Sequence, residues 1–566
     1  MAKAMIYRRD YRPHPYVITQ TFLDFKLDAA KTVVTATSVV CRRRTTRGPL
    51  VLAGRQLELV SVEIEGKHLK AKDFRQTSEQ LIIKTPPSRK RQFTLAIKTI
   101  IHPAKNLALE GLYQSGHILC TQNEPEGMRR ITYFIDRPDN LVRFKVRLTA
   151  RQDKYPCLLS NGKLVAEGKM GKWHFAEWKD PIPKPCYLLA VVAGKLDFIE
   201  DYFVTAENRK VTLRIFCDPG RGKYCGHAMT ALKAAMRWDE VMFGRCYDLD
   251  IFMIVAVDAF NMGAMENKGL NIFNAAYVLA DPQTATDQDY LKIFGVIGHE
   301  YFHNWTGNRI TCRDWFQLTL KEGLTVFRDQ EFSASQRPPA LQRWDDVQLI
   351  KNVQFAEDAS PLAHPIRPNQ YQEINNFYTT TIYDKGAEVI RMLQTFLGKQ
   401  KFREGMDRYF ALFDGQAVTT DDFLAAVTGQ LSRQQKAFLR KRGFSAAQLK
   451  APAFALAAFK NWYQQAGTPR VTVQARYDEK QQTLTLKVQQ KNEALPPKLR
   501  GGEKPVYFPL GLGLWVQGER IPLQLKDRAQ QKAQQDFLAQ GVLAIKNRQE
   551  KFVLQNVAAR PVLSLL

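Results

Sequence analysis

The sequence predicts a multidomain α+β protein, because the spacing of its apolar residues changes twice along the chain. Residues 1–196 mostly alternate apolar and polar side chains, which is the pattern of half-buried strands. Helical periodicity begins near residue 228, and strand-like alternation returns beyond residue 467. A chain of 566 residues, of which 45% are hydrophobic, is also long and apolar enough to build several cores.

These patterns predict three domains in order. The first, over residues 1–196, is an antiparallel β domain, since turn signals such as Ser160-Asn161-Gly162 separate its alternating segments. The second, over residues 197–466, mixes strands and helices. The third, over residues 467–566, is a small β-sandwich. Residues 429–461 are basic and rich in Gln and Ala, and we expect them to form an enlarged surface connection.

Within the middle domain, a predicted helix at 228–243 precedes a predicted strand at 250–257. The apolar run at 290–297 favours a buried helix that continues into the sequence His299-Glu300-Tyr301-Phe302-His303. A further helix is expected to begin near residue 320 and to carry Glu322. The functional residues of this domain are therefore expected on two neighbouring helices.

The pair His299 and His303 points to a metal site. Side chains four residues apart lie on one helical face, so both imidazoles can bind a single ion. With Glu322 they form a three-ligand zinc site with one open position, the arrangement of catalytic rather than structural zinc. Glu300 lies off that face and is better placed to take a proton from a water at the metal. The alternative is a helix that carries two histidines satisfied within the core.

The charge balance is strongly basic. Lysine and arginine total 82 against 56 acidic residues, so the formal net charge is +26. Basic residues cluster at 42–44, 89–91 and 433–442, and such surfaces attract nucleic acid, anionic membranes or acidic proteins. No nucleic-acid-binding motif accompanies these clusters. We interpret them as solvated basic faces and keep polyanion binding as an alternative.

Cysteine usage and hydropathy bear on the compartment. Eight cysteines lie between Cys41 and Cys312 without a CxxC pair, which favours reduced thiols. No stretch approaches the roughly 18 apolar residues needed to span a bilayer. The N-terminus also lacks the apolar segment of a secretory signal. We therefore expect a cytoplasmic protein without a membrane span.

Four segments together resemble the aminopeptidase N family of zinc metallopeptidases, and its bacterial members most closely. They are the histidine motif at 299–303, the sequence Gly-Ala-Met-Glu-Asn at 263–267, the segment at 377–386 and the segment at 121–127. The motifs follow one another in the order that the family shows, and the resemblance runs from about residue 5 to the end. It implies a thermolysin-like fold for the middle domain and one Zn²⁺ per chain, bound by His299, His303 and Glu322.

The resemblance also implies removal of N-terminal residues from peptides, with a broad preference for apolar and basic residues and with alanine among the substrates. Glu300 is then the general base, and Tyr383 donates a hydrogen bond to the developing oxyanion. Fixed carboxylates recognise a protonated α-amine well, because charge-assisted hydrogen bonds are strong. The substrate-binding residues that the resemblance implies are Gln122, Glu124, Met262, Gly263, Ala264, Met265, Glu266, Asn267 and Tyr378.

Simple chemistry suggests a role for several individual residues. Glu266 is the first candidate for the α-amine and Glu124 the second. Met262 and Tyr378 are expected to line the pocket of the first side chain, although core packing would explain either residue nearly as well. Asp329, seven residues beyond Glu322, is a candidate to support a metal ligand.

In one respect the sequence departs from the family pattern. Bacterial members continue with a large helical C-terminal domain that covers the active site, whereas this sequence stops at Leu566. We therefore expect either a separate chain that supplies this cover or a truncated homologue of reduced activity. Two alternatives follow: a catalytically weak or inactive protein that acts through its basic surface, and an endopeptidase opened by the missing cover.

Overall fold

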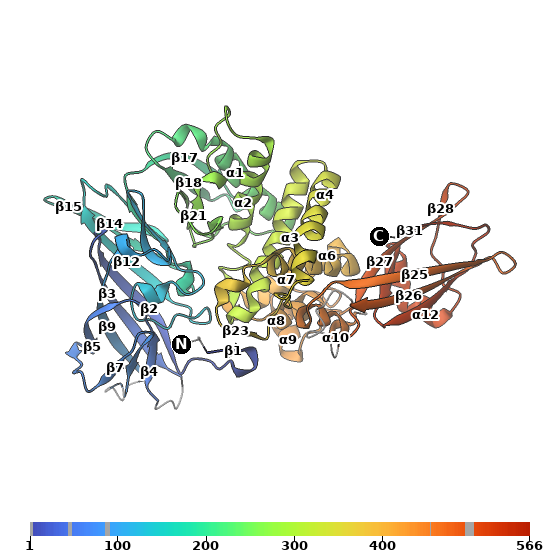
Figure 1. Cartoon of the computed structure of the whole chain (residues 1–566), viewed down its shortest axis with the longest axis horizontal. Coiled ribbons are helices and arrows are strands. Elements are labelled where there is room, and N and C mark those ends of the chain that lie inside the picture. The colour runs from blue at the N-terminus through green and yellow to red at the C-terminus, as the bar shows by residue number, and fades with distance from the viewer. Residues whose placement is uncertain are drawn as a thin grey trace.

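The computed structural model describes residues 4–43, 48–84, 86, 91–452, 454–492 and 503–565. Figure 1 shows a blue N-terminal body of strands, a green-to-orange middle body of strands and helices, and a red C-terminal β body, arranged along the longest axis. The predicted multidomain α+β fold is confirmed. The basic residues Arg44, Arg89 and Lys90 of two predicted clusters lie outside the described residues.

The described part of the N-terminal body contains three sheets, and the long strands at 16–26, 32–42 and 92–101 alternate buried residues with more exposed ones, as the sequence predicts. The largest sheet has the order β14 (Lys163–Met170), β15 (Trp173–Lys179), β12 (Arg143–Arg151), β2 (Tyr16–Lys26), β3 (Thr32–Arg42), β9 (Gln92–Ile101), β5 (Glu58–Ile64), β6 (Lys67–His68). The second has the order β4 (Leu50–Ala53), β8 (Gln80–Ile83), β7 (Phe74–Gln76). The third has the order β10 (Gly111–Ser115), β11 (Ile118–Gln122), β16 (Val191–Gly194), β13 (Cys157–Ser160). Pairing is antiparallel apart from β12 and β2, which are parallel.

The middle body is built on a five-stranded sheet of order β17 (Asp197–Val204), β18 (Lys210–Cys217), β19 (Ile251–Val257), β21 (Leu270–Asn274), β20 (Ala264–Met265). Strand β19 is buried on both faces, as central parallel strands usually are. Phe252 and Ile254 join the core under the helices, whereas Met253 and Val255 join the core of the N-terminal body. The sheet therefore holds the N-terminal body and the helices in a fixed relation, which matters because the site takes residues from both.

Helices cover the other side of this sheet (Figure 1). The longer ones are α1 (Gly226–Phe243), α2 (Asp287–Phe302), α3 (Leu318–Gln336), α4 (Pro339–Leu349), α6 (Gly386–Leu397), α7 (Lys399–Phe413) and α8 (Thr420–Val427). Between them lie the short α5 (Phe355–Asp358) and two π-helical turns, η8 (Ile350–Gln354) and η10 (Thr381–Lys385). Two short pairs tie distant segments together: β1 (Ile6–Tyr7) with β23 (Gln370–Tyr371), and β22 (Ile310–Cys312) with β24 (Gln416–Val418). Turns of 3₁₀ type occupy Arg8–Asp10, Pro103–Lys105, Met128–Arg130, Cys186–Leu188, Gly222–Tyr224, Ala275–Tyr277, Trp315–Gln317 and Ile374–Phe377.

Residues 429–461, predicted to form a surface connection, contain short helices. They contain α9 (Arg433–Lys441) and α10 (Leu456–Phe459), and α11 (Asn461–Gln464) follows at the end of the segment. Leu439 and Phe459 are fully buried in the main core. Most other residues of the segment are exposed or half-buried, and the apolar Phe438 of α9 is exposed. The described part of the segment therefore lies largely at the surface, and a few apolar side chains anchor it to the main core.

The C-terminal body is a sandwich of two antiparallel sheets with a core of its own. One sheet has the order β25 (Pro469–Asp478), β26 (Thr483–Asn492), β30 (Gln549–Leu554). The other has the order β28 (Glu519–Ile521), β27 (Phe508–Val516), β29 (Val542–Ile545), with β31 (Val562–Leu565) also paired to β27 and α12 (Arg528–Leu538) beside it. The exact domain boundaries at 196/197 and 466/467 stay a prediction.

Candidate metal-dependent active site

A cavity of about 510 Å³ lies where α2, α3 and η10 meet strand β20. Close helix packing creates it. A Cβ on Gly298 would lie 2.7 Å from the ring of Phe332, so α2 and α3 approach closely. A Cβ on Gly323 would lie 2.9 Å from the backbone of Gly386, so α3 also approaches the segment that follows Tyr383. These glycines let three elements converge on one point.

Three candidate metal-ligand atoms meet at the centre of this cavity. The Nε2 atoms of His299 and His303 are 2.9 Å apart, and Glu322 Oε2 lies 3.5 Å and 3.3 Å from them. A tetrahedral zinc ion with bonds near 2.0–2.1 Å places its ligand atoms about 3.3 Å apart. Among the described residues, this is the candidate metal-binding group that contains two imidazoles. The spacing of the three atoms therefore fits a zinc ion.

The hydrogen bonds of the two rings fit a metal as well. His303 Nδ1 faces the backbone oxygen of Thr306 at 3.0 Å, so this nitrogen carries the proton. His299 Nδ1 lies 2.7 Å from the carboxylate of Asp329. Both rings thus direct Nε2 at Glu322 Oε2, a buried atom without a hydrogen-bond partner among the described residues. Two ring nitrogens and a carboxylate oxygen that converge in this way suit a bound cation.

Helix α2 carries the histidines into place. A capping box between Thr286 and Asp289 fixes its first turn. At its other end, Arg328 Nη1 donates to the carbonyl of Phe302 at 2.8 Å, next to His303. Arg328 is completely buried and pairs with the equally buried Asp239 of α1. The end of α2 is therefore held by a charged side chain from α3 rather than left to fray.

Glu300 lies beside the histidines in the same cavity. Its Oε2 is buried and has no hydrogen-bond partner within the described part of the chain. Burial, together with the neighbouring Glu266 and Glu322 carboxylates, raises the pKa of Glu300 well above its usual range. A carboxylate with raised basicity beside a metal site is suited to accept a proton.

Sequence reasoning missed Lys321, which organises the other side of the cavity. Its Nζ lies 2.6 Å from Glu124, 2.8 Å from Glu266 and 2.5 Å from Glu322. Burial alone would lower the pKa of this lysine, but the three carboxylates outweigh it and raise the pKa well above its usual range. One ammonium thus gathers two predicted amine-binding residues and a predicted metal ligand. The sequence signal was weak, since Lys321 simply precedes Glu322.

The two predicted amine-binding carboxylates differ in basicity. Burial and the nearby Glu266 raise the pKa of Glu124 to about 8. Burial also acts on Glu266, but Lys321 and His303 outweigh it and lower its pKa. Tyr378 Oη donates to Glu124 at 3.0 Å. Glu266 is therefore the carboxylate that stays ionised, and Glu124 is the one that titrates near neutrality.

The remaining predicted site residues lie around this centre with one exception. Gln122, Met262, Gly263, Ala264, Met265 and Tyr378 line the cavity, and the Tyr383 ring stacks on His299 with a centroid distance of 6.4 Å. Burial raises the pKa of Tyr383 well above its usual range, so its hydroxyl remains a donor at neutral pH. Asn267 is fully buried and does not line the cavity.

Asp329 supports the site from outside the predicted ligand set. We expect Asp329→Asn to weaken zinc binding by roughly 10–100-fold, because the carboxylate that orients His299 and raises its basicity is replaced by a neutral amide. Competition with a chromogenic chelator measures the affinity. Asp345→Asn, at a half-exposed carboxylate of the same cavity that pairs with Arg337, is the matched control and should leave zinc affinity unchanged. Equal affinities for all three proteins would contradict the role of Asp329.

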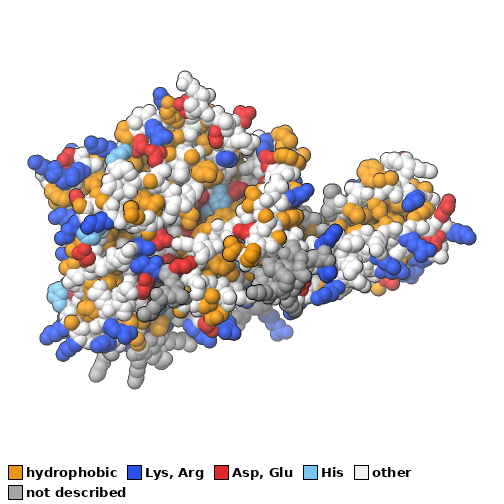
Figure 2. All heavy atoms as spheres, viewed as in Figure 1, with side chains coloured by type: hydrophobic (Ala, Val, Ile, Leu, Met, Phe, Trp, Pro, Cys, Tyr) orange, Lys and Arg blue, Asp and Glu red, His pale blue; other side chains and the backbone are white. Residues whose placement is uncertain are grey.

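The described structure also bears on the thiols, on membrane-spanning helices and on the surface charge. All eight cysteines are unpaired. None of the helices in the described ranges is both long and apolar enough to cross a membrane. Figure 2 shows Lys and Arg side chains spread over the outer ends of the molecule, at the N-terminal strands and the C-terminal β body.

Comparison with known proteins agrees with this geometry. Residues 11–188 match the model of the peptidase M1 N-terminal domain, and residues 227–441 match the peptidase family M1 domain. Residues 467–566 match an Ig-like domain of unknown function.

Whole-chain relatives are longer than this chain. Aminopeptidase N of Escherichia coli is 49% identical over 99% of the chain and 60% of its own length. Aminopeptidase N of Haemophilus influenzae is 46% identical over 100% of the chain and 61% of its own length. The crystal structure of Legionella pneumophila aminopeptidase A in complex with aspartic acid has a TM-score of 0.83 and 30% identity, over 100% of this chain and 60% of that one. The chain therefore spans about 60% of the length of these relatives. Both M1 domains are matched in order, and nearly half of the residues are identical to those of an aminopeptidase N. The chain belongs to peptidase family M1.

Proposed function

We propose that this chain is a zinc-dependent aminopeptidase that hydrolyses the N-terminal peptide bond of peptides. One observation carries the proposal: a cluster of two imidazoles and a carboxylate, spaced as zinc ligands, shares one cavity with the buried pair Glu124 and Glu266. The first group is suited to metal-assisted hydrolysis, and the second is suited to binding a free amine. The alternative of an inactive basic binding protein is not favoured, because the side chains proposed for hydrolysis line one cavity.

His299, His303 and Glu322 would hold one zinc ion per chain. When bound, the ion would polarise the scissile carbonyl and lower the pKa of the attacking water. Glu300 would take the proton of that water and deliver it to the leaving amine, since its carboxylate is buried, basic and free of hydrogen bonds at Oε2 among the described residues. Tyr383 would donate a hydrogen bond to the oxyanion as a neutral phenol.

Recognition of the substrate amine falls to Glu266 and Glu124. Both accept from Lys321, but a carboxylate offers about four lone-pair sites, so capacity for an ammonium remains. Gln122 would contribute its buried Oε1, which has no partner within the described residues. The backbone of Gly263 and Ala264 would pair with the extended substrate beside the short strand β20. This arrangement would place the first peptide bond of the substrate, one residue from its free amine, at the metal site.

The finer assignments are proposals of the same kind. Met262 and Tyr378 would line the pocket of the first side chain, which suits a broad preference that includes alanine. Eight unpaired cysteines support a reducing compartment, the cytoplasm. We keep the domain boundaries 1–196, 197–466 and 467–566 as a proposal.

Alanine 4-nitroanilide and its N-acetylated form test the proposal directly. We expect the free amine to be hydrolysed at least about 100-fold faster than the acetylated form, because a blocked amine loses its charge-assisted contacts with Glu266 and Glu124. A zinc chelator should abolish the release of nitroaniline, and added zinc should restore it. Equal rates on both substrates would indicate an endopeptidase. Rates that ignore the chelator would contradict the metal mechanism.

A further inference from the structure

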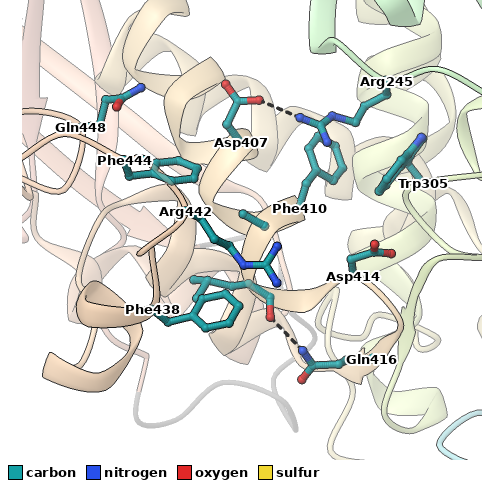
Figure 3. A pocket seen from close by; sticks show the side chains of 13 residues that line it. Arg245, Trp305, Asp407, Phe410, Asp414, Gln416, Phe438, Arg442, Phe444 and Gln448 are labelled. Atoms are coloured by element: carbon teal, nitrogen blue, oxygen red, sulfur yellow. Dashed lines mark hydrogen bonds and ion pairs between the residues drawn. The ribbon is translucent and has the colours of Figure 1, made fainter. Parts of the chain in front are cut away.

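The structure contains a second large cavity, of about 570 Å³, outside the active site. Figure 3 shows it between α7, the end of α9 and the segment around Asp414 and Gln416. Its apolar walls are aromatic: Trp305, Phe410, Phe438 and Phe444. Trp305 lies two residues beyond the predicted metal ligand His303, so the two cavities are close neighbours along the chain.

Part of this cavity lies beyond the matched family domains. The M1 domain match ends at residue 441, and the Ig-like match begins at residue 467. Arg442, Gly443, Phe444 and Gln448, which line the cavity, fall between them. Arg442 is the last residue of the basic run at 433–442, and the other three follow it. The proposed peptidase site does not use this run.

The acidic groups of the cavity are already neutralised. Asp407 pairs with Arg245 at 3.3 Å and with Arg403 at 3.1 Å. Asp414 forms two hydrogen bonds with Arg309, at 2.8 Å and 2.5 Å. A ligand therefore meets no unpaired negative charge on these walls.

Arg442 is a cation of this cavity whose charge is not paired among the described residues. Its guanidinium stacks on the Phe438 ring with a distance of 4.5 Å to the centroid, and no ion pair to it is found within the described ranges. Figure 3 shows the side chain reaching into the cavity between Phe438 and Asp414. A guanidinium that is stacked on one face keeps its N–H edge free, and that edge matches a carboxylate in two parallel hydrogen bonds.

The walls are held in place without a ligand. Helix α9 ends at Lys441, and Gly443 just beyond it has a φ of 88°, which suits glycine and turns the chain so that Phe444 lies against the cavity. Phe444 N donates to the carbonyl of Leu439 at 3.2 Å. The buried Arg408 of α7 donates to the carbonyl of Gln448 at 2.5 Å and to that of Ala426 at 2.9 Å. A preformed pocket avoids much of the ordering entropy of binding.

We propose that this cavity is a second ligand-binding site, which takes small molecules that join an aromatic or bulky apolar body to a carboxylate. The body packs among Phe410, Phe438 and Phe444, and the carboxylate pairs with Arg442. Trp305 also lines the cavity. The mixture of aromatic walls with one convergent charge is typical of small-molecule sites.

A fluorinated probe tests this site on the intact chain. The probe 3-(4-fluorophenyl)propanoate has no amine for Glu266, and its fluorine resonance reports binding by line broadening. We expect a Kd on the order of 1 mM or tighter, as the usual binding energy per ligand atom implies. Arg442→Gln should weaken binding by about tenfold or more, since it removes a charge-assisted pair. Ala411→Phe, which fills the cavity, should abolish binding.

The controls decide where the probe binds. Lys441→Gln removes a neighbouring exposed charge of the same helix that does not line the cavity, and it should change the Kd less than twofold. The uncharged amide of the same probe should bind the native chain about tenfold more weakly or worse. Equal affinity for Arg442→Gln and Lys441→Gln, equal affinity for the amide, or no binding to the native chain would each overturn the proposal.

Discussion

Glu300→Gln is expected to lower kcat by roughly 10²–10⁴-fold while the protein keeps its zinc. The substitution preserves the size of the side chain, but an amide accepts protons far too weakly to serve as a general base. The ligand atoms of His299, His303 and Glu322 stay in place, because the described structure shows no hydrogen bond from Glu300 Oε2 to any of them. Hydrolysis of alanine 4-nitroanilide, measured beside zinc content, separates the two effects.

Gln330→Glu is a useful companion, because it adds a carboxylate elsewhere in the same cavity. The double variant Glu300→Gln/Gln330→Glu tests whether a carboxylate at this position on α3 can replace Glu300. We expect no recovery, since the base must lie beside the metal. Undiminished turnover in Glu300→Gln with full zinc would remove Glu300 from the mechanism.

Tyr383→Phe is expected to lower kcat by about 10²–10³-fold with little change in KM, because one donor to the oxyanion is lost only in the transition state. The ring itself should stay in place, since it stacks on His299 through its face and lies on the short π-helical turn η10. Burial keeps the phenol neutral, so the effect should persist across neutral pH. Steady-state kinetics on the free-amine substrate measure both constants.

Tyr378→Phe provides the contrast. Its hydroxyl donates to Glu124, so its loss should act on amine recognition and raise KM more than it lowers kcat. If the two tyrosines gave the same pattern of kcat and KM, the assignment of Tyr383 to the oxyanion would be wrong.

Some of the site was predictable because its signals are local. The spacing of His299 and His303 on one helix follows from helical periodicity, and the structure brings both Nε2 atoms within 2.9 Å. The prediction that Glu322 is a metal ligand required the assumption that a second helix packs beside the first. The close approach at Gly298 now supplies the physical reason.

Other parts were not predictable, since they depend on contacts between distant segments. Lys321 meets Glu124 of the N-terminal body and Glu266 of the middle body only because the five-stranded sheet packs against both. The short motif containing Asn267 suggested a cavity residue, yet the chain turns this side chain into the protein interior. The segment at 429–461 read as basic and exposed, because composition conceals the few apolar residues that α9 and α10 bury.

Zinc X-ray absorption on the native chain tests the central claim most directly. We predict about one zinc per chain with a first shell of nitrogen and oxygen near 2.0–2.1 Å, including two imidazoles and no sulfur. Glu322→Ala should lose most of the metal, because the carboxylate oxygen 3.3 Å from His303 Nε2 closes the ligand set. A sulfur ligand, a shell without imidazole, or an unchanged spectrum and zinc content in Glu322→Ala would contradict the site.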